Sequence, residues 1–204
     1  IAVVVLVVVV VVGNKSGGCG GAATDGTWCD QSTGWLWQNP PDEESRTWDD
    51  ANAFCDHLSL GGHSDWALPT IGELRTLIRN CPDTVSAGPC DVTDECLASK
   101  CLNKACKGCS DRRPAGGMFW DAALGGPVSL PKMTSAYAAL KAPTNWFWSS
   151  SPLSRSDSKA WYVDFQFGEV GYIVRESRKI GGLYGEGPMG FGRTRCVRRP
   201  EQNP

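Results

Sequence analysis

The sequence predicts an α+β domain that combines two short helices with a small antiparallel sheet and carries a cysteine-rich loop insertion and an N-terminal apolar β-strand. Three observations support this fold class. Two amphipathic segments begin at helix-capping residues, aromatic-rich strands separated by turn residues occupy the last third, and ten cysteines imply a disulfide framework. The length of 204 residues fits one sizeable domain with a tail.

Shifts in composition divide the chain into segments. Residues 1–12 are an apolar assembly strand or signal segment, and residues 13–27 are a Gly-rich linker. Residues 28–200 form the folded domain, with a disulfide-rich insertion at residues 81–109, and residues 201–204 are a tail. The net charge of −2 gives no overall attraction to nucleic acid or to anionic membranes, so neither is expected as a partner.

Residues 1–12 read IAVVVLVVVVVV, and three interpretations compete for them. A helix of this length reaches only about 18 Å, which is too short to span a bilayer. The run also resembles the apolar region of a signal peptide, and membrane attachment then requires a lipid on Cys19. We favour a β-strand whose two apolar faces are covered by neighbouring copies in a homopolymer. Its assembly residues are Ile1, Val3, Val5, Val7, Val9 and Val11.

The first helix is predicted to begin at Thr47 and to stop at Gly61 and Gly62, because glycine favours helix termination. Its apolar residues recur at intervals of three and four, which places them on one face. These residues are Ala51, Phe54, Cys55 and Leu58.

The second helix is predicted to begin at Thr70 and to end near Asn80. Residues 70–73 read TIGE and fit a capping box, in which the threonine hydroxyl and the glutamate carboxylate bind free backbone amides. Leu74 and Leu77 supply the buried face of this helix.

Residues 81–109 contain six cysteines among polar residues and show little apolar periodicity. Local pairing would give three disulfides, although six cysteines allow fifteen connectivities. The CxxC of Cys106 and Cys109 also suggests zinc, but a structural zinc site usually needs a second such pair. We therefore expect disulfides, which form in an oxidising compartment. The cysteines are Cys81, Cys90, Cys96, Cys101, Cys106 and Cys109.

Short strands are predicted on both sides of the insertion. Residues 35–37 form an early strand that is entered from a Thr-Gly turn. Residues 146–151, 160–165 and 170–174 form later strands, of which the last two make a hairpin, and residues 194–198 form the final strand.

Several ordered blocks carry a family resemblance: TGWLWQ, TWDDANAFC, GGHSDWALPTIGELRTL, WFWSSS, AWYVDF and RCVR. Over about Asp30 to Arg198 the chain resembles the C-terminal domain family of the Legionella collagen-like adhesin. The resemblance implies a variant C-type-lectin-like fold, related to the formylglycine-generating-enzyme type. It also implies a bacterial surface or secreted protein that attaches to other surfaces and contacts polysaccharide. The insertion and the poly-valine run depart from the family pattern.

The same resemblance implies a disulfide between Cys55 and Cys196, which leaves Cys19 and Cys29 to pair with each other or with a neighbour. Relatives that oxidise a substrate cysteine use a pair of copper-binding cysteines near the C-terminus, where this chain has Cys196 alone. We therefore expect no catalytic residues, no cofactor and no metal.

The remaining polar groups do not form a recognisable catalytic set. We interpret His57 and His63 as solvated or capping residues, because the sequence reveals no partner for either. One acidic cluster lacks the graded ligand spacing of a dedicated calcium loop, and calcium binding there stays open. Its residues are Asp91, Asp94 and Glu95.

Basic residues concentrate near the C-terminus, where they offer either a solvated surface or contacts with sulfated or acidic polysaccharide. The candidate glycan-binding residues are Arg175, Arg178, Lys179 and Arg193. Most tryptophans are expected to anchor the core, with one or two aromatic side chains exposed.

Two functions are consistent with these features. The first is a non-catalytic subunit, on the bacterial cell surface or outside the cell, that builds or decorates a filament through the apolar strand. The alternative is a lipid-anchored or secreted adhesin that binds polysaccharide.

Overall fold

The computed structural model describes residues 25–112, 114, 117–125, 145–176, 190 and 192–200. This part of the chain contains short α-helices and two three-stranded antiparallel sheets, which confirms the predicted α+β class. The sequence suggested one small sheet, whereas the structure divides the strands between two. The predicted assembly strand at residues 1–12 lies outside the described residues.

The first sheet joins the two ends of the described chain. β1 (Thr27–Asp30) pairs with β2 (Trp35–Gln38), and β2 pairs on its other side with β6 (Val197–Arg198). The Asp30 carboxylate accepts a hydrogen bond from the Ser32 amide at 2.9 Å and thereby shapes the tight turn between β1 and β2. The sequence does not predict β1, because this four-residue strand is too short to show a period of two.

The second sheet consists of β3 (Trp146–Pro152), β4 (Lys159–Asp164) and β5 (Glu169–Val174), in the order of the sequence. These strands and the β4–β5 hairpin confirm the prediction to within one residue at each end. Alternate residues of β4 face opposite sides of the sheet, so that fully buried Trp161 belongs to the larger core and Ala160 packs toward α1.

The first helix, α1 (Trp48–Asp56), begins where the sequence predicts. The Thr47 hydroxyl caps it by accepting a hydrogen bond from the amide three residues on, at 3.3 Å. The helix ends before the predicted stop at Gly61, because the following chain turns back on itself where Leu60 pairs with His63.

The second helix, α2 (Ile71–Arg75), contains the predicted capping box. The Thr70 hydroxyl accepts a hydrogen bond from the Glu73 amide at 3.2 Å, and the Glu73 carboxylate accepts one from the Thr70 amide at 2.8 Å. Leu74 and Leu77 are fully buried, as predicted. The helix is shorter than predicted, because the amides beyond it bond to carbonyls three residues back and form successive tight turns.

Replacing Thr70 by alanine is expected to lower the free energy of unfolding by about 1–2 kcal/mol. The change removes the α2 cap together with the hydrogen bond that the Thr70 hydroxyl donates to Asp94 at 2.8 Å. Urea denaturation of the variant would measure the loss. Thr70→Ser is the matched control, because it keeps the hydroxyl and should unfold near the wild-type midpoint; an equal loss in both variants would contradict the capping explanation.

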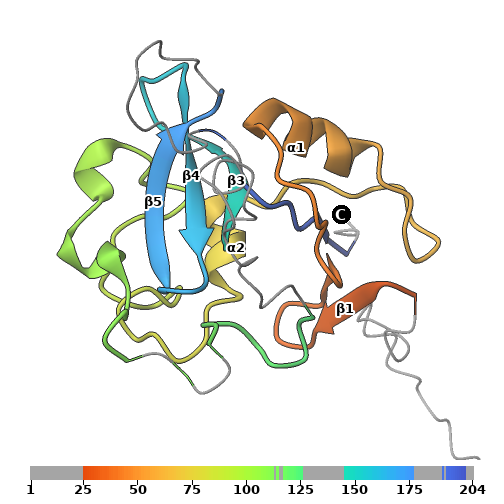
Figure 1. Cartoon of the computed structure of the whole chain (residues 1–204), viewed down its shortest axis with the longest axis horizontal. Coiled ribbons are helices and arrows are strands. Elements are labelled where there is room, and N and C mark those ends of the chain that lie inside the picture. The colour runs from red at the N-terminus through yellow and green to blue at the C-terminus, as the bar shows by residue number, and fades with distance from the viewer. Residues whose placement is uncertain are drawn as a thin grey trace, which may run out of the picture.

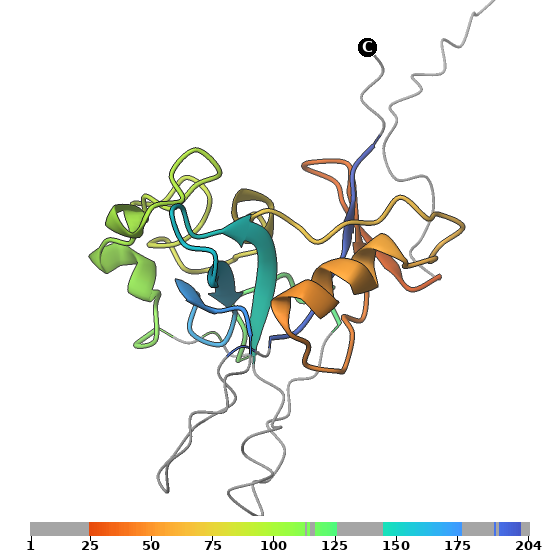
Figure 2. The same ribbon diagram turned by 90° about the horizontal axis from the view of Figure 1, so that it is seen from above.

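The two sheets, the helices and the insertion form two cores. Figure 1 shows the β3-β4-β5 sheet with the insertion (green) on one side and with α1 and β1 on the other, and Figure 2 shows the same separation from above. The larger core lies between this sheet, α2 and the insertion, and the smaller core lies between α1 and the opposite face of the sheet. The insertion itself contains two 3-10 helices, η1 (Ser99–Cys101) and η2 (Lys104–Lys107).

Candidate binding site

A polar hollow of about 460 Å³ lies where the start of α1, the turn between β3 and β4, and the end of β5 meet. Two backbone hydrogen bonds hold these segments together. The Trp48 amide donates to the Arg175 carbonyl oxygen at 3.2 Å, and the Arg175 amide donates to the Ser158 carbonyl oxygen at 2.8 Å. The hollow is lined by Asp49, Asp157, Ser158, Val174, Arg175 and Glu176.

The Arg175 guanidinium is held in one orientation by two contacts. Its central carbon lies 4.1 Å from the centre of the Trp48 ring, which is the stacked arrangement that arginine favours on aromatic faces. Its Nε donates to the Lys159 carbonyl oxygen at 3.2 Å. Trp48 is fixed in turn, because its indole nitrogen donates to the Ser149 carbonyl oxygen at 2.7 Å. The arginine is therefore preorganised at the edge of the hollow.

The side chains around Arg175 complement it chemically. Asp49, Asp157 and Glu176 are exposed and supply carboxylate oxygens that accept hydrogen bonds, whereas the guanidinium only donates them. Val174 adds an apolar surface to the lining. Donors and acceptors arranged around a small apolar surface suit a ligand whose adjacent hydroxyl groups both donate and accept hydrogen bonds.

The structure separates the four basic residues that the sequence groups as glycan-binding candidates. Arg175 lines the hollow, while Arg178 and Lys179 lie outside the described residues. Arg193 is only 1% exposed, so its assignment to a binding surface is wrong. Its backbone bonds to one edge of β3, at Trp146 and Trp148, and this pairing directs its side chain into the protein. Burial lowers the pKa of Arg193, while Glu43 and Asp42 act in the opposite direction.

The other arginines near the C-terminus also serve the fold. Arg195 is fully buried and donates hydrogen bonds to the carbonyl oxygens of Gln38 at 2.9 Å and Gly125 at 2.7 Å. Arg198 forms an ion pair with Asp65 at 2.7 Å. These arginines therefore do not form the solvated basic surface that sequence alone suggests.

The expected exposed aromatic side chains are not found among the described residues. Trp37, Trp148 and Trp161 are fully buried, and Trp35 is half-buried. The large hydrophobic side chain that is exposed in this part of the chain is Leu102, in the insertion. Sequence patterns do not distinguish this leucine, because its exposure depends on the disulfides beside it.

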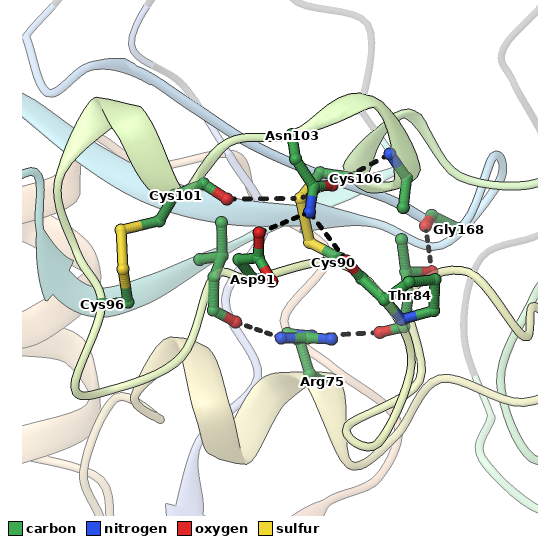
Figure 3. The surroundings of a disulfide bond; sticks show 12 residues. Arg75, Thr84, Cys90, Asp91, Cys96, Cys101, Asn103, Cys106 and Gly168 are labelled. Carbon is green, nitrogen blue, oxygen red and sulfur yellow. Dashed lines mark hydrogen bonds between the residues drawn. A yellow bond between two sulfur atoms is a disulfide. The ribbon is translucent and has the colours of Figure 1, made fainter.

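Three nested disulfides close the insertion, which confirms local pairing and identifies its connectivity. Figure 3 shows the inner two, Cys90–Cys106 and Cys96–Cys101. Both cysteines of the CxxC motif bond to other partners, which excludes the zinc interpretation. The disulfide implied by the family resemblance is also present, and Cys29 is disulfide-bonded; Cys19, one of the two partners considered for it, lies outside the described residues. The pairs are Cys81–Cys109, Cys90–Cys106, Cys96–Cys101 and Cys55–Cys196.

Buried Arg75 anchors the insertion to α2 (Figure 3). Its guanidinium donates to the carbonyl oxygens of Thr84 at 3.0 Å and Val85 at 2.8 Å, and also to that of Val92. Thr84 continues the connection, because its hydroxyl donates to the Gly168 carbonyl oxygen at 2.6 Å in the β4–β5 turn. Sequence analysis assigns Arg75 no role, since its partners are backbone atoms of an irregular loop.

The histidines and the acidic cluster of the insertion have structural contacts. His57 is exposed at the end of α1, where Nδ1 lies 2.7 Å from the Ala53 carbonyl oxygen, in keeping with a capping residue. Asp94 accepts a hydrogen bond from the Gly72 amide at 3.0 Å, and Asp91 accepts one from Asn103 at 2.7 Å. Within the described residues, no group of three His, Cys, Asp or Glu side chains is arranged to hold a metal ion.

Comparison with protein families identifies the chain. A family model described as the Lcl C-terminal domain matches residues 26–180. The chain belongs to this family. Lcl C-terminal domains are adhesin-related domains of bacterial surface proteins, so the match confirms the resemblance that the sequence motifs indicate. No curated protein and no solved structure gave a significant match.

The Lcl C-terminal domain match covers α1, α2, the insertion and the β3-β4-β5 sheet, and therefore every residue that lines the hollow. It ends before β6 and Cys196, which complete the first sheet and the long-range disulfide. Within the described residues, no helix has the length and apolar character needed to cross a membrane.

Proposed function

We propose that this chain is a non-catalytic adhesion domain that acts on the bacterial surface or outside the cell and binds carbohydrate in the polar hollow. The observation that carries the proposal is the Arg175 guanidinium, which is stacked on Trp48 and shares the lining of the hollow with three acidic residues. The adhesin-related family supports this function, and the disulfide framework fits an oxidising location.

The charges in the hollow indicate which carbohydrates it would bind. Three carboxylates and one guanidinium line it, which gives the described lining a net negative charge. Sulfate and uronate groups would be repelled by the carboxylates, so we expect neutral saccharides rather than the acidic polysaccharides suggested by the basic residues in the sequence. Arg175 would donate to two adjacent hydroxyls, and the carboxylates would accept from them.

Replacing Arg175 by methionine is expected to weaken saccharide binding by roughly tenfold to a hundredfold, because hydrogen bonds from a charged donor are lost while the apolar stem stays. A glycan array would identify a neutral ligand, and isothermal titration would compare the affinities. Arg155→Met, in the β3–β4 turn that borders the hollow but outside the lining, is the matched control and should bind like wild type. Unchanged affinity in the Arg175 variant would place carbohydrate binding elsewhere or exclude it.

A second proposal concerns residues 1–12. Residues 1–12 are all apolar, so a strand formed by them has apolar side chains on both faces. This favours a strand that completes the sheet of another copy, which would make the chain a homopolymer. Intact mass spectrometry of the protein isolated from its native surface tests this role. A mass that includes residues 1–12 supports the strand, whereas a chain that begins at a lipidated Cys19 supports a membrane-anchored adhesin instead.

A further inference from the structure

Leu102 projects from a rigid part of the insertion. Its side chain is the exposed large hydrophobic group in the described chain, at 38% exposure. The preceding Cys101 is buried in a disulfide with Cys96, and Cys106, a few residues on, is buried in a disulfide with Cys90. Because these neighbouring cysteines are tied inward, the chain between them must pass over the surface, with Leu102 on its outside.

The residue after Leu102 fixes the same short segment from within. The side-chain nitrogen Nδ2 of Asn103 donates to the Pro89 carbonyl oxygen and to the Asp91 carboxylate, each at 2.7 Å, and the side-chain oxygen accepts from the Ala105 backbone amide at 2.9 Å (Figure 3). A surface that is already ordered loses little conformational entropy when it binds a partner. The insertion therefore presents a preformed contact surface.

Two lysines complete this surface. Lys100 and Lys104 lie two residues before and after Leu102, both are exposed, and neither takes part in an ion pair within the described residues. We name Lys100, Leu102 and Lys104 the insertion tip. A surface that complements it would combine an apolar patch with carboxylates around it.

The chain itself contains such a surface. The polar hollow has Val174 in its lining together with the carboxylates of Asp49, Asp157 and Glu176. We propose that the insertion tip of one copy docks into the hollow of a second copy, with Leu102 against Val174 and the lysines beside the carboxylates. This self-association goes beyond carbohydrate binding and does not depend on it.

The positions of the two surfaces determine what kind of assembly this contact would build. Figures 1 and 2 place the insertion on one side of the β3-β4-β5 sheet and α1, whose first turn borders the hollow, on the other. The two surfaces are different, so the contact is heterologous and leaves each dimer with a free tip and a free hollow. Further copies would add at both ends.

Sedimentation velocity of the full chain over a concentration series at low salt tests the proposal. We expect concentration-dependent association that weakens as salt is raised. Leu102→Ser should weaken it at least about tenfold, because the apolar contact is lost. Arg112→Glu is the control, since it changes the charge of an exposed residue just beyond the insertion and outside the tip. A wild-type chain that stays monomeric at every concentration, or a Leu102 variant that associates like wild type, would overturn the proposal.

Charge reversal identifies the two surfaces independently of any other contact. The variant Lys100→Glu/Lys104→Glu has an acidic tip and hollow, and the variant Asp157→Lys/Glu176→Lys has a basic tip and hollow. Each variant alone should lose the salt-sensitive part of the association, and an equimolar mixture should regain it. Salt-sensitive association of either variant alone at wild-type strength contradicts the proposal, as does a mixture that regains none of it; association through the apolar residues 1–12 would not weaken with salt and is thereby distinguished.

Saccharide binding by the reversed-tip variant, whose hollow is unchanged, separates this inference from the proposed function. Retained binding supports the carbohydrate site whatever the association experiment shows.

Discussion

Replacing Cys55 and Cys196 together by serine is expected to lower the free energy of unfolding by about 4–5 kcal/mol. The disulfide joins α1 to the segment before β6, across a sequence separation of 141 residues, and both cysteines are fully buried. Without it the unfolded chain gains the entropy of a very long open loop. The smaller core also loses the covalent bond between α1 and the segment before β6. Since domains of this size are stabilised by only about 5–15 kcal/mol, denaturant titration should show a large shift of the midpoint.

The disulfide Cys96–Cys101 provides the matched control, because its sequence separation is only 5 residues. Replacing both of its cysteines by serine should cost about 2 kcal/mol, since the loop that it closes is short. If the two double variants lost equal stability, loop closure would not explain the contribution of the long-range disulfide.

Replacing Arg75 by methionine is expected to cost about 3 kcal/mol of unfolding free energy. The methionine fills similar space but leaves the carbonyl oxygens of Thr84, Val85 and Val92 without their donor. Part of this loss is offset, because desolvation already disfavours the charged guanidinium and lowers the pKa of Arg75. Chemical denaturation measures the total effect.

Hydrogen exchange localises the effect of the same variant. Faster exchange should be confined to residues 81–109 and should spare α1, because the Arg75 side chain donates to backbone carbonyl oxygens of the insertion. Arg79→Met is the control: Arg79 is half-buried and donates to carbonyls of its own local segment, so the loss should stay below about 1 kcal/mol. A uniform increase in exchange would mean that Arg75 supports the whole fold.

Local chemistry explains why much of the fold can be predicted from sequence. Thr47 and Thr70 begin helices because their hydroxyls replace missing backbone partners, and this requirement is visible in a few adjacent residues. The aromatic strands β3, β4 and β5 are equally recognisable by composition and turns.

Features that depend on distant segments could not be predicted in this way. β1 forms because β2 lies beside it, and the buried position of Arg193 is set by its pairing with β3. The hollow joins residues near positions 49, 157 and 175, and no local pattern relates them. Arg175, which its charge made a candidate for glycan binding, lies in this lining, whereas the carboxylates beside it carry no distinguishing signal in the sequence.

The nested arrangement of disulfides in the insertion also has a kinetic consequence. The sequence separations are 5, 16 and 28 residues from the innermost to the outermost pair. The shortest loop has the smallest closure entropy, and each bond that forms shortens the free chain between the next two cysteines. Oxidative folding can therefore proceed outward from Cys96 and Cys101 in an ordered sequence, with few of the alternative pairings competing at any step.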